Sequence, residues 1–219
     1  MRDKNLLTIL EQRVVVSISG LYEHDCVELM AALKIGGASV IAISVEDAFE
    51  IQKVINTIVV ARKQFGPDIL IGVNNVTNVD MVYQLGKAGA QFVISPNTNA
   101  EMIKATHDAD MVSIPGAMTP NEVINAYDCG ADIVHVYPAR WLGPAYFTYI
   151  NKALKHIPTM TSGGIDRNNL RLYMNAGVDV VMADDCLYSE EQLAKRQWCT
   201  IAENTRNFMN TVVKRQVRF

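Results

Sequence analysis

The chain has 219 residues, of which 49% are hydrophobic and 20% are charged, and its formal net charge at pH 7 is −3. This length accommodates one large α/β domain with a well-buried core, and the composition is that of an ordinary globular protein. The weak negative charge gives no electrostatic reason for binding to nucleic acid or to an anionic membrane, so we expect neither partner.

Cysteine usage and hydropathy limit the protein class further. Four cysteines are scattered through the chain, at Cys26, Cys129, Cys186 and Cys199. They show no Cys-x-x-Cys spacing, which favours free thiols in a reducing compartment. Residues 1–13 are too charged for a signal peptide, and no apolar run approaches the roughly 18 residues of a membrane span. We therefore expect a cytoplasmic protein with a single domain over residues 1–219.

The first half of the chain alternates short apolar runs with segments of helical periodicity. A short leading helix is expected at residues 6–12, because its leucines and isoleucine form one apolar face. Helices are expected to end at Gly36, Gly66 and Gly89, since left-handed caps favour glycine. The expected strands are residues 13–19, 39–44, 69–73 and 91–95, and the expected helices are residues 23–35, 46–65, 79–88 and 100–106.

The second half repeats this alternation. Thr119 and Asp166 are candidate N-caps, and the Gly-Pro pair at 143–144 is typical of a helix start. The Pro-Gly pair at 115–116 is expected in a loop. The expected strands are residues 111–114, 132–137, 158–161 and 178–183, and the expected helices are residues 119–129, 144–155, 166–176 and one long final helix over 189–215.

Strands that alternate with helices at a period of about 20–30 residues predict a parallel sheet. An Ala-Gly joint before a strand recurs at residues 87–90 and 175–178. This repetition favours an α/β fold of the closed (β/α)8 TIM-barrel type, with a short N-terminal helix and a long C-terminal helix. The alternative is an open doubly wound sheet, but no Gly-x-Gly-x-x-Gly follows the first strand.

Polar residues at the carboxyl ends of the strands are the candidate site residues, because the active site of a TIM barrel lies there. His135, in the sixth expected strand, is the candidate catalytic residue. The candidate ligand-binding residues are Ser44, Asn75, Ser95, Pro96, Tyr137, Thr161, Ser162, Gly163, Gly164 and Asp184.

His135 interrupts an apolar β-branched run, so its direction depends on the alternation of side chains along the strand. If Val134 and Val136 face the helices, the imidazole faces the barrel interior. It is then either a neutral histidine satisfied within the core or a general base. The chain has no His-x-His or His-Glu-x-x-His pattern, so we expect no metal site and no cofactor.

The Ser162-Gly163-Gly164 turn has two interpretations. Its N–H groups can bind a phosphate, as loops after the seventh strand of a TIM barrel do, or the turn simply requires small residues. Asp184 and Asp185 follow the eighth strand, and two carboxylates near an anion are unfavourable. The pocket is still suited to a cation, a hydroxyl or an amine, and Asp184 is otherwise a helix or loop cap.

Four stretches in the same order resemble the 2-keto-3-deoxy-6-phosphogluconate / 4-hydroxy-2-oxoglutarate aldolase family. They are residues 88–96 (AGAQFVISP), residues 114–122 (IPGAMTPNE), residues 137–144 with YPA and LGP, and residues 161–165 (TSGGI). The resemblance covers nearly the whole chain. It implies a (β/α)8 barrel, usually a homotrimer, in which a lysine forms a Schiff base with pyruvate.

Other residues stand at the functional positions of that family. In the resemblance, the Schiff-base lysine falls at His135, the general acid/base glutamate at Ala42 and a substrate-binding arginine at Glu46. The glycine-rich Gly-x-Gly-Thr segment falls at residues 72–75, and the small residues of the phosphate loop fall at residues 183–185. Imidazole cannot form the protonated imine, and alanine has no proton to transfer.

These replacements leave three hypotheses. The first is an aldolase-like protein that is not a working class I aldolase, and that either binds a small polar ligand such as a 2-oxo acid or has a structural or regulatory role. The second is a lyase acting on a 2-oxo acid, with His135 as general base near Asp184, Tyr137 or Asn75. The third is a weak surviving aldolase activity.

Overall fold

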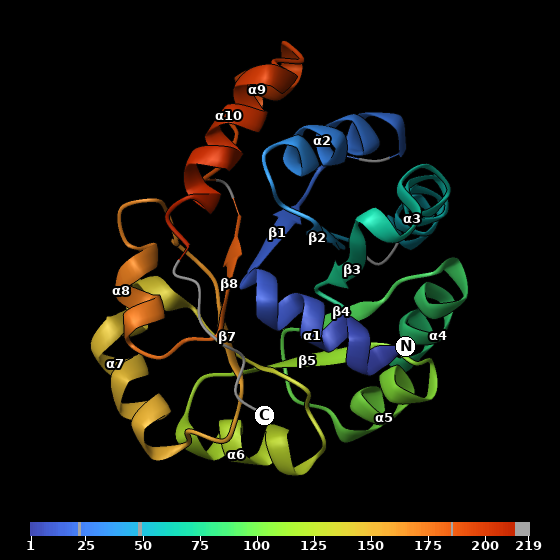
Figure 1. The fold of residues 1–219 in the computed structure, drawn as a ribbon. Helices are drawn as coiled ribbons and strands as arrows, with labels where there is room; N and C mark the ends of the chain where they lie inside the picture. The colour runs from blue at the N-terminus through green and yellow to red at the C-terminus, as the bar shows by residue number, and fades with distance from the viewer. Residues whose placement is uncertain (22, 48–49, 185, 213–219) are drawn as a thin grey trace.

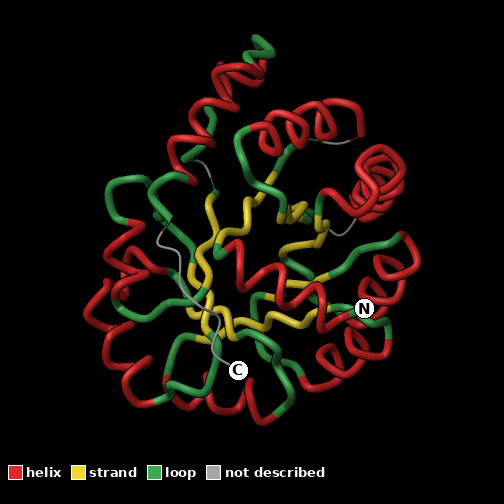
Figure 2. Tube along the Cα trace, viewed as in Figure 1, coloured by secondary structure: helices red, strands yellow, loops and turns green. Residues whose placement is uncertain are grey.

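Parallel strands close into one barrel in the computed structural model, which describes residues 1–21, 23–47, 50–184 and 186–212. The strands are β1 (Val14–Ile18), β2 (Val40–Ser44), β3 (Leu70–Asn74), β4 (Phe92–Ser95), β5 (Val112–Ala117), β6 (Val134–Val136), β7 (Thr159–Thr161) and β8 (Val180–Ala183). Each strand pairs with its sequence neighbours, and β8 pairs with β1 to complete the ring (Figure 2). The prediction of a TIM barrel is therefore confirmed, and the open sheet is wrong.

Helices surround the barrel on its outside, except α1 (Arg2–Gln12), which lies across one end (Figure 1). The other helical elements are α2 (Glu23–Ile35), α3 (Ile51–Phe65), the 3-10 turn η2 (Gly66–Asp68), α4 (Val79–Ala88), α5 (Ala100–Asp108), α6 (Pro120–Asp128), α7 (Ala139–Ala153), α8 (Leu170–Asn175), α9 (Glu190–Ala194) and α10 (Trp198–Met209). Across the described ranges, no helix combines the length and the apolar character that crossing a membrane requires.

The alternation of side chains along the strands separates two apolar cores. The outer core lies between strands and helices and includes Val134 and Val136 of β6. The inner core fills the barrel, and α1 crosses its amino-terminal opening (Figure 1). The inner core consists of Ile9, Val15, Val40, Ala42, Leu70, Phe92, Ile94, Val112, Ile114, Ile133, Met160, Val180 and Met182. The carboxyl ends of the strands lie at the opposite opening, where the site is expected.

β5 is longer than the sequence predicts. It runs through the Pro-Gly pair at 115–116, which we expected in a loop. A Cβ at Gly116 would lie 2.3 Å from the carbonyl oxygen of Pro96, so the missing side chain lets the two chain segments approach. α3 begins at Ile51, although we expected a helix from residue 46, and residues 48–49 lie outside the described ranges.

The Gly-Pro pair at 143–144 interrupts α7, whereas we expected it to start the helix. The helix already begins at Ala139, and Gly143 has a φ of 73° and a ψ of 160°, which are not helical values. Residues 139–142 therefore form one turn that a kink separates from the rest of α7. This turn carries Arg140 and Trp141 close to the end of β6.

The single final helix expected over residues 189–215 is two helices in the structure. Ser189 starts α9 with a capping box, and Arg196, with a φ of 49°, lies in the break before α10. α10 packs against α2, and α9 projects farthest from the barrel (Figure 1). Residues 213–215 lie outside the described ranges.

The sequence predicts N-caps at two helix starts, and the structure confirms one of them. Thr119 accepts a hydrogen bond from the N–H of Glu122, whose side chain accepts one from the N–H of Thr119, so the predicted N-cap of α6 is confirmed. Asp166 accepts hydrogen bonds from the N–H groups of Asn168 and Asn169. α8 begins only after Asn169, so Asp166 stabilises the turn that precedes the helix.

The inner core has no room for a side chain at Gly72. Gly72 of β3 pairs with Phe92 of β4, and an added Cβ would lie 2.3 Å from the Phe92 ring. We expect Gly72→Ala to lower the free energy of unfolding by about 1–3 kcal/mol, because the fully buried ring must move to accept the methyl group. Urea denaturation measures this difference.

A double-mutant cycle with Phe92→Leu provides the control. Leucine is smaller than phenylalanine and leaves space beside Gly72. Gly72→Ala should therefore cost less free energy in the Phe92→Leu background than in the wild type, because contacting residues are not additive. An equal cost in both backgrounds would contradict the contact between Gly72 and the aromatic ring.

Candidate functional site

Neutral polar side chains line the carboxyl ends of β1, β2 and β3. The hydroxyl oxygens of Ser17 and Ser44 lie 2.9 Å apart, and the side-chain nitrogen of Asn74 donates to Ser44 Oγ at 3.3 Å. All three residues are buried. Asn75, the predicted site residue next to this cluster, is exposed. These three buried side chains therefore offer hydrogen bonds without charge.

His135 lies inside the barrel. Its neighbours Val134 and Val136 belong to the outer core, so alternation along β6 turns the imidazole inward, as we expected. Nε2 lies 2.8 Å from Oγ of Ser162, the residue that follows β7. The ring stacks on Tyr137, with the ring centroids 4.5 Å apart. Only 4% of His135 is exposed.

Burial sets the protonation state of His135. Desolvation lowers the pKa of the imidazole from 6.5 to about 3, so the ring is neutral at neutral pH. Nδ1 has no hydrogen-bond partner among the described residues. A buried N–H without an acceptor is rarely tolerated. We therefore place the proton on Nε2, from which it is donated to Ser162.

Three further predicted residues make hydrogen bonds to the backbone. The Tyr137 hydroxyl donates to the carbonyl oxygen of Pro96 at 2.8 Å, and burial raises the pKa of this phenol. Ser95 Oγ donates to a carbonyl two residues later at 2.8 Å. Thr161 Oγ1 donates to a carbonyl of β6 at 2.7 Å. These groups tie together the loops around His135.

A pocket of about 470 Å³ opens over the loops that follow β6, β7 and β8. Three predicted residues line it, namely Gly163, Gly164 and Asp184. Residues that the sequence analysis did not select complete the lining: Pro138, Arg140, Trp141, Ile165, Asp166 and Cys186. The predicted residues are thus divided between the barrel mouth and this pocket.

Arg140 and Trp141 line the pocket, although neither was selected as a site residue from the sequence. They stand directly after the sixth strand, on the turn that precedes the kink in α7. We expected the helix to start only at the 143–144 pair, so Arg140 was expected at the barrel mouth in the loop after the strand, without an assigned role. An arginine beside a tryptophan at a strand end was the available signal.

Both signs of charge face the pocket. Asp184 Oδ2 accepts a hydrogen bond from the N–H of Gly163 at 3.3 Å. The Arg140 side chain lies against Gly164, where an added Cβ would be 2.7 Å from Nε. Because Asp184 occupies the Gly163 N–H and repels anions, the turn is poorly suited to a phosphate. Asp184 thus bridges the loops that follow β7 and β8.

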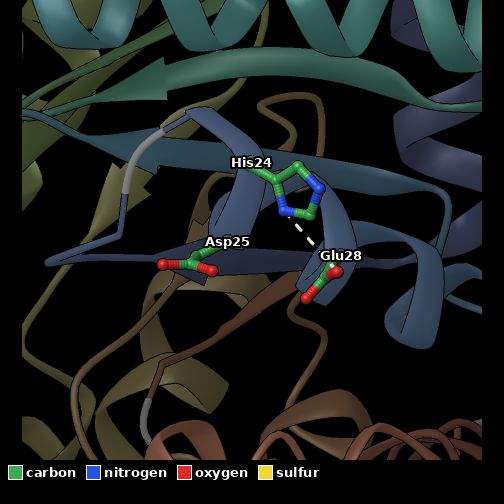
Figure 3. A group of neighbouring side chains, drawn as sticks. All are labelled: His24, Asp25 and Glu28. Carbon is green, nitrogen blue, oxygen red and sulfur yellow. Dashed lines mark ion pairs between the residues drawn. The ribbon is translucent and has the colours of Figure 1, made fainter.

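A group of potential metal ligands lies at the start of α2. His24, Asp25 and Glu28 each offer an atom within 4.8 Å of the others (Figure 3). The Arg196 guanidinium donates to Asp25 at 2.7 Å and to Glu28 at 2.9 Å. Since an arginine already neutralises these carboxylates, we interpret the group as an ion-pair network that holds the break between α9 and α10 against α2.

No lysine lies on a strand within the described part of the chain. Lys155, which we expected on a helix, follows α7 in a turn that leads into β7. It is therefore near the amino-terminal end of the barrel, away from the mouth. The described lysines on helices are Lys4, Lys34, Lys53, Lys63, Lys87, Lys104 and Lys152, and Lys195 follows α9.

His135 should make the free energy of unfolding depend on pH. The unfolded ring titrates near 6.5 and the folded ring near 3, so between these values the unfolded state binds more protons and stability rises with pH. Lowering the pH from 7 to 5 should cost the wild type roughly 2 kcal/mol more than His135→Gln, whose side chain does not titrate. Urea denaturation at both pH values measures this. A parallel loss in both proteins would show that the folded imidazole accepts protons readily.

The chain matches the family model described as KDPG and KHG aldolase over residues 7–204. The 2-dehydro-3-deoxy-6-phosphogalactonate aldolase of Escherichia coli is 28% identical over 60% of this chain and 65% of its own length, a little under two thirds. The 2-dehydro-3-deoxy-phosphogluconate aldolase of Treponema pallidum is 28% identical over 77% of this chain and 80% of its own length.

Solved structures share the barrel. The KDPG aldolase from Legionella pneumophila, with pyruvate captured as a covalent carbinolamine intermediate, has a TM-score of 0.81 at 23% identity and covers 92% of this chain and 96% of its own. A native KDPGal structure has a TM-score of 0.78 at 21% identity and covers 90% of this chain and 96% of its own. The family model spans most of the chain and the fold agrees with it. This chain therefore belongs to the KDPG and KHG aldolase family.

Proposed function

We propose that this chain is a family member that does not perform class I aldolase chemistry, and that it binds a small polar ligand at the carboxyl end of its barrel. The observation that carries the proposal is the inward, buried His135 on β6, at the position where the resemblance expects the Schiff-base lysine. The described strands carry no lysine that could replace it.

The chemistry of a Schiff base requires a primary amine and a group that moves protons. His135 supplies a neutral imidazole whose Nε2 is bonded to Ser162. Ala42, at the position expected for the glutamate, lies in the apolar inner core and has no proton to transfer. Each loss lowers the rate by orders of magnitude. A retained barrel does not require a retained reaction.

The pocket beside Gly163 and Gly164 supports the ligand-binding part of the proposal. Its volume of about 470 Å³ is typical of small-molecule sites. The charged side chains of Arg140, Asp166 and Asp184 line it, and such a lining favours a polar ligand over an apolar one. If the pocket binds no ligand, a structural or regulatory role is the alternative.

A lyase that uses His135 as general base is the second candidate. The Nδ1 atom of His135 favours it, because with the proton on Nε2 this nitrogen is the one that can accept a proton, and it has no partner among the described residues. A general base works best when its pKa lies near the operating pH. The pKa of His135 is about 3, which makes the ring a weak base at neutral pH. Ligand binding without aldolase chemistry is therefore the better proposal.

Treatment with pyruvate and borohydride should leave the protein unlabelled. Borohydride reduces an imine to a stable amine, so an aldolase with a reactive lysine gains the mass of a reduced pyruvate. Because no described lysine lies at the carboxyl end of a strand, we expect no such mass increase. Intact-protein mass spectrometry gives the result, with a lysine-dependent KDPG aldolase as positive control. A reduced adduct on any lysine, including Lys214 beyond the described ranges, would contradict the proposed absence of class I aldolase chemistry.

We also propose a homotrimer, on the family resemblance. The residues that pack subunits and the residues that carry out catalysis are different, so assembly can persist where the reaction is lost. Light scattering coupled to size exclusion should give three times the chain mass. The His135→Gln variant should give the same mass, because that residue is buried in the barrel. A mass equal to one chain would exclude the trimer.

A further inference from the structure

The pocket over β6, β7 and β8 presents a guanidinium and carboxylates to the same space. We propose that it binds a small zwitterion, with a carboxylate of the ligand at Arg140 and a cationic nitrogen of the ligand between Asp184 and the face of Trp141. This inference rests on the proposed ligand-binding function of the site and names the chemical class of the ligand.

Arg140 supplies the anion-binding half. Its backbone N–H donates to the carbonyl oxygen of Gly163 at 2.9 Å, which fixes the turn that carries it. Its side chain lies against Gly164, which has a φ of 88° and lacks the Cβ that would displace the guanidinium. Arg140 forms no ion pair with any residue in the described ranges. A guanidinium held at a pocket wall in this way is suited to a ligand carboxylate.

Asp184 supplies the cation-binding half. The N–H of Gly163 donates to its Oδ2 at 3.3 Å, which holds the carboxylate at the pocket. The second carboxylate of the lining, on Asp166, accepts N–H groups of the following turn at 2.7 Å and 3.0 Å. Asp166 serves the fold of its own loop. We assign the ligand's cation to Asp184 because its carboxylate is held at the pocket wall by Gly163.

Trp141 adds an aromatic wall beside these charges. It is 81% exposed although it lines the pocket. A cation is attracted to the face of an indole ring, and tryptophan is the aromatic residue that binds cations best in this way. An exposed indole that lines the same pocket as carboxylates is therefore suited to an ammonium group of a ligand.

A ligand of a single charge satisfies only half of this arrangement. A carboxylic acid without a nitrogen gains Arg140 but meets the like charge of Asp184, and a phosphate carries more of the same repulsion. An amine without a carboxylate gains Asp184 but meets the like charge of Arg140. A zwitterion places each of its charges opposite the residue of the other sign, so the pocket discriminates by repulsion as well as attraction.

The fluorescence of Trp141 gives a direct readout of binding. The chain has two tryptophans, and the other, Trp198, lies on α10 and not in the pocket. The Trp198→Phe protein therefore reports on Trp141 alone. It is titrated with glycine, 3-aminopropanoate and 4-aminobutanoate, and with the carboxylic acid and the amine of matching chain length. At least one amino acid should bind about tenfold or more tightly than both of its single-charge partners.

Two variants assign the charges. Arg140→Gln should remove the advantage of the amino acid over the amine. Asp184→Asn keeps an acceptor for the Gly163 N–H and should remove the advantage over the carboxylic acid. Each variant should weaken amino-acid binding about tenfold or more. Glu101→Gln, an exposed residue on α5, is the matched control and should bind like the parent protein.

Two results would overturn this inference. A carboxylic acid or an amine that binds as tightly as the amino acid would identify a single-charge site, and ligand binding itself would still stand. No response to any of the three amino acids would exclude the ligand class. A pyruvate adduct on a lysine would instead overturn the proposed absence of aldolase chemistry, so the two failures are distinguishable.

Discussion

The hydrogen bond between His135 and Ser162 joins β6 to the end of β7 inside the barrel, and the chemistry of the mouth depends on it. The imidazole is buried, and the desolvation lowers its pKa, so the ring is neutral at neutral pH. Tyr137 stacks on the ring and donates to the carbonyl of Pro96, which ties the end of β4 to the same group. These contacts support our proposal that His135 contributes to packing and does not act as a base.

The stability of the barrel depends little on the polar residues at its mouth. The inner core and α1 fill the interior from the amino-terminal side, and Arg13 closes the ring there by donating to the carbonyls of Val178 and Asp179 at 2.7 Å and 3.0 Å. Outside, apolar side chains of strands and helices form a second core, to which a few loop residues such as Val76 and Leu187 also belong. Polar residues after the strands can therefore change while the fold persists.

The periodicity of apolar residues in the sequence predicted helix bounds and strand direction well where neighbouring residues alone decide the local structure. The bounds of α2 and α4 agree with the prediction, and His135 points inward as alternation along β6 requires. Local pattern failed at the kink of α7 and at the break between α9 and α10, because tertiary contacts and a left-handed Arg196 decide them. Arg140 lies on the helical turn before that kink, and the sequence pattern did not predict this turn or the pocket that it lines.

The charges around the pocket and the neutral interior of the barrel both disfavour the binding of a polyanion. The buried cluster of Ser17, Ser44 and Asn74 offers hydrogen bonds without charge, and His135 adds none at neutral pH. Arg140 is the one cation among the described lining residues, and Asp184 stands across the turn from it. A polyanion would therefore gain one attraction and meet a repulsion in a site with no second cation to offset it. On the family resemblance, a neutral residue at the lysine position and an aspartate after β8 alter the electrostatics of the mouth in the same sense, and this supports our proposal of a ligand with balanced charge over a phosphorylated acid.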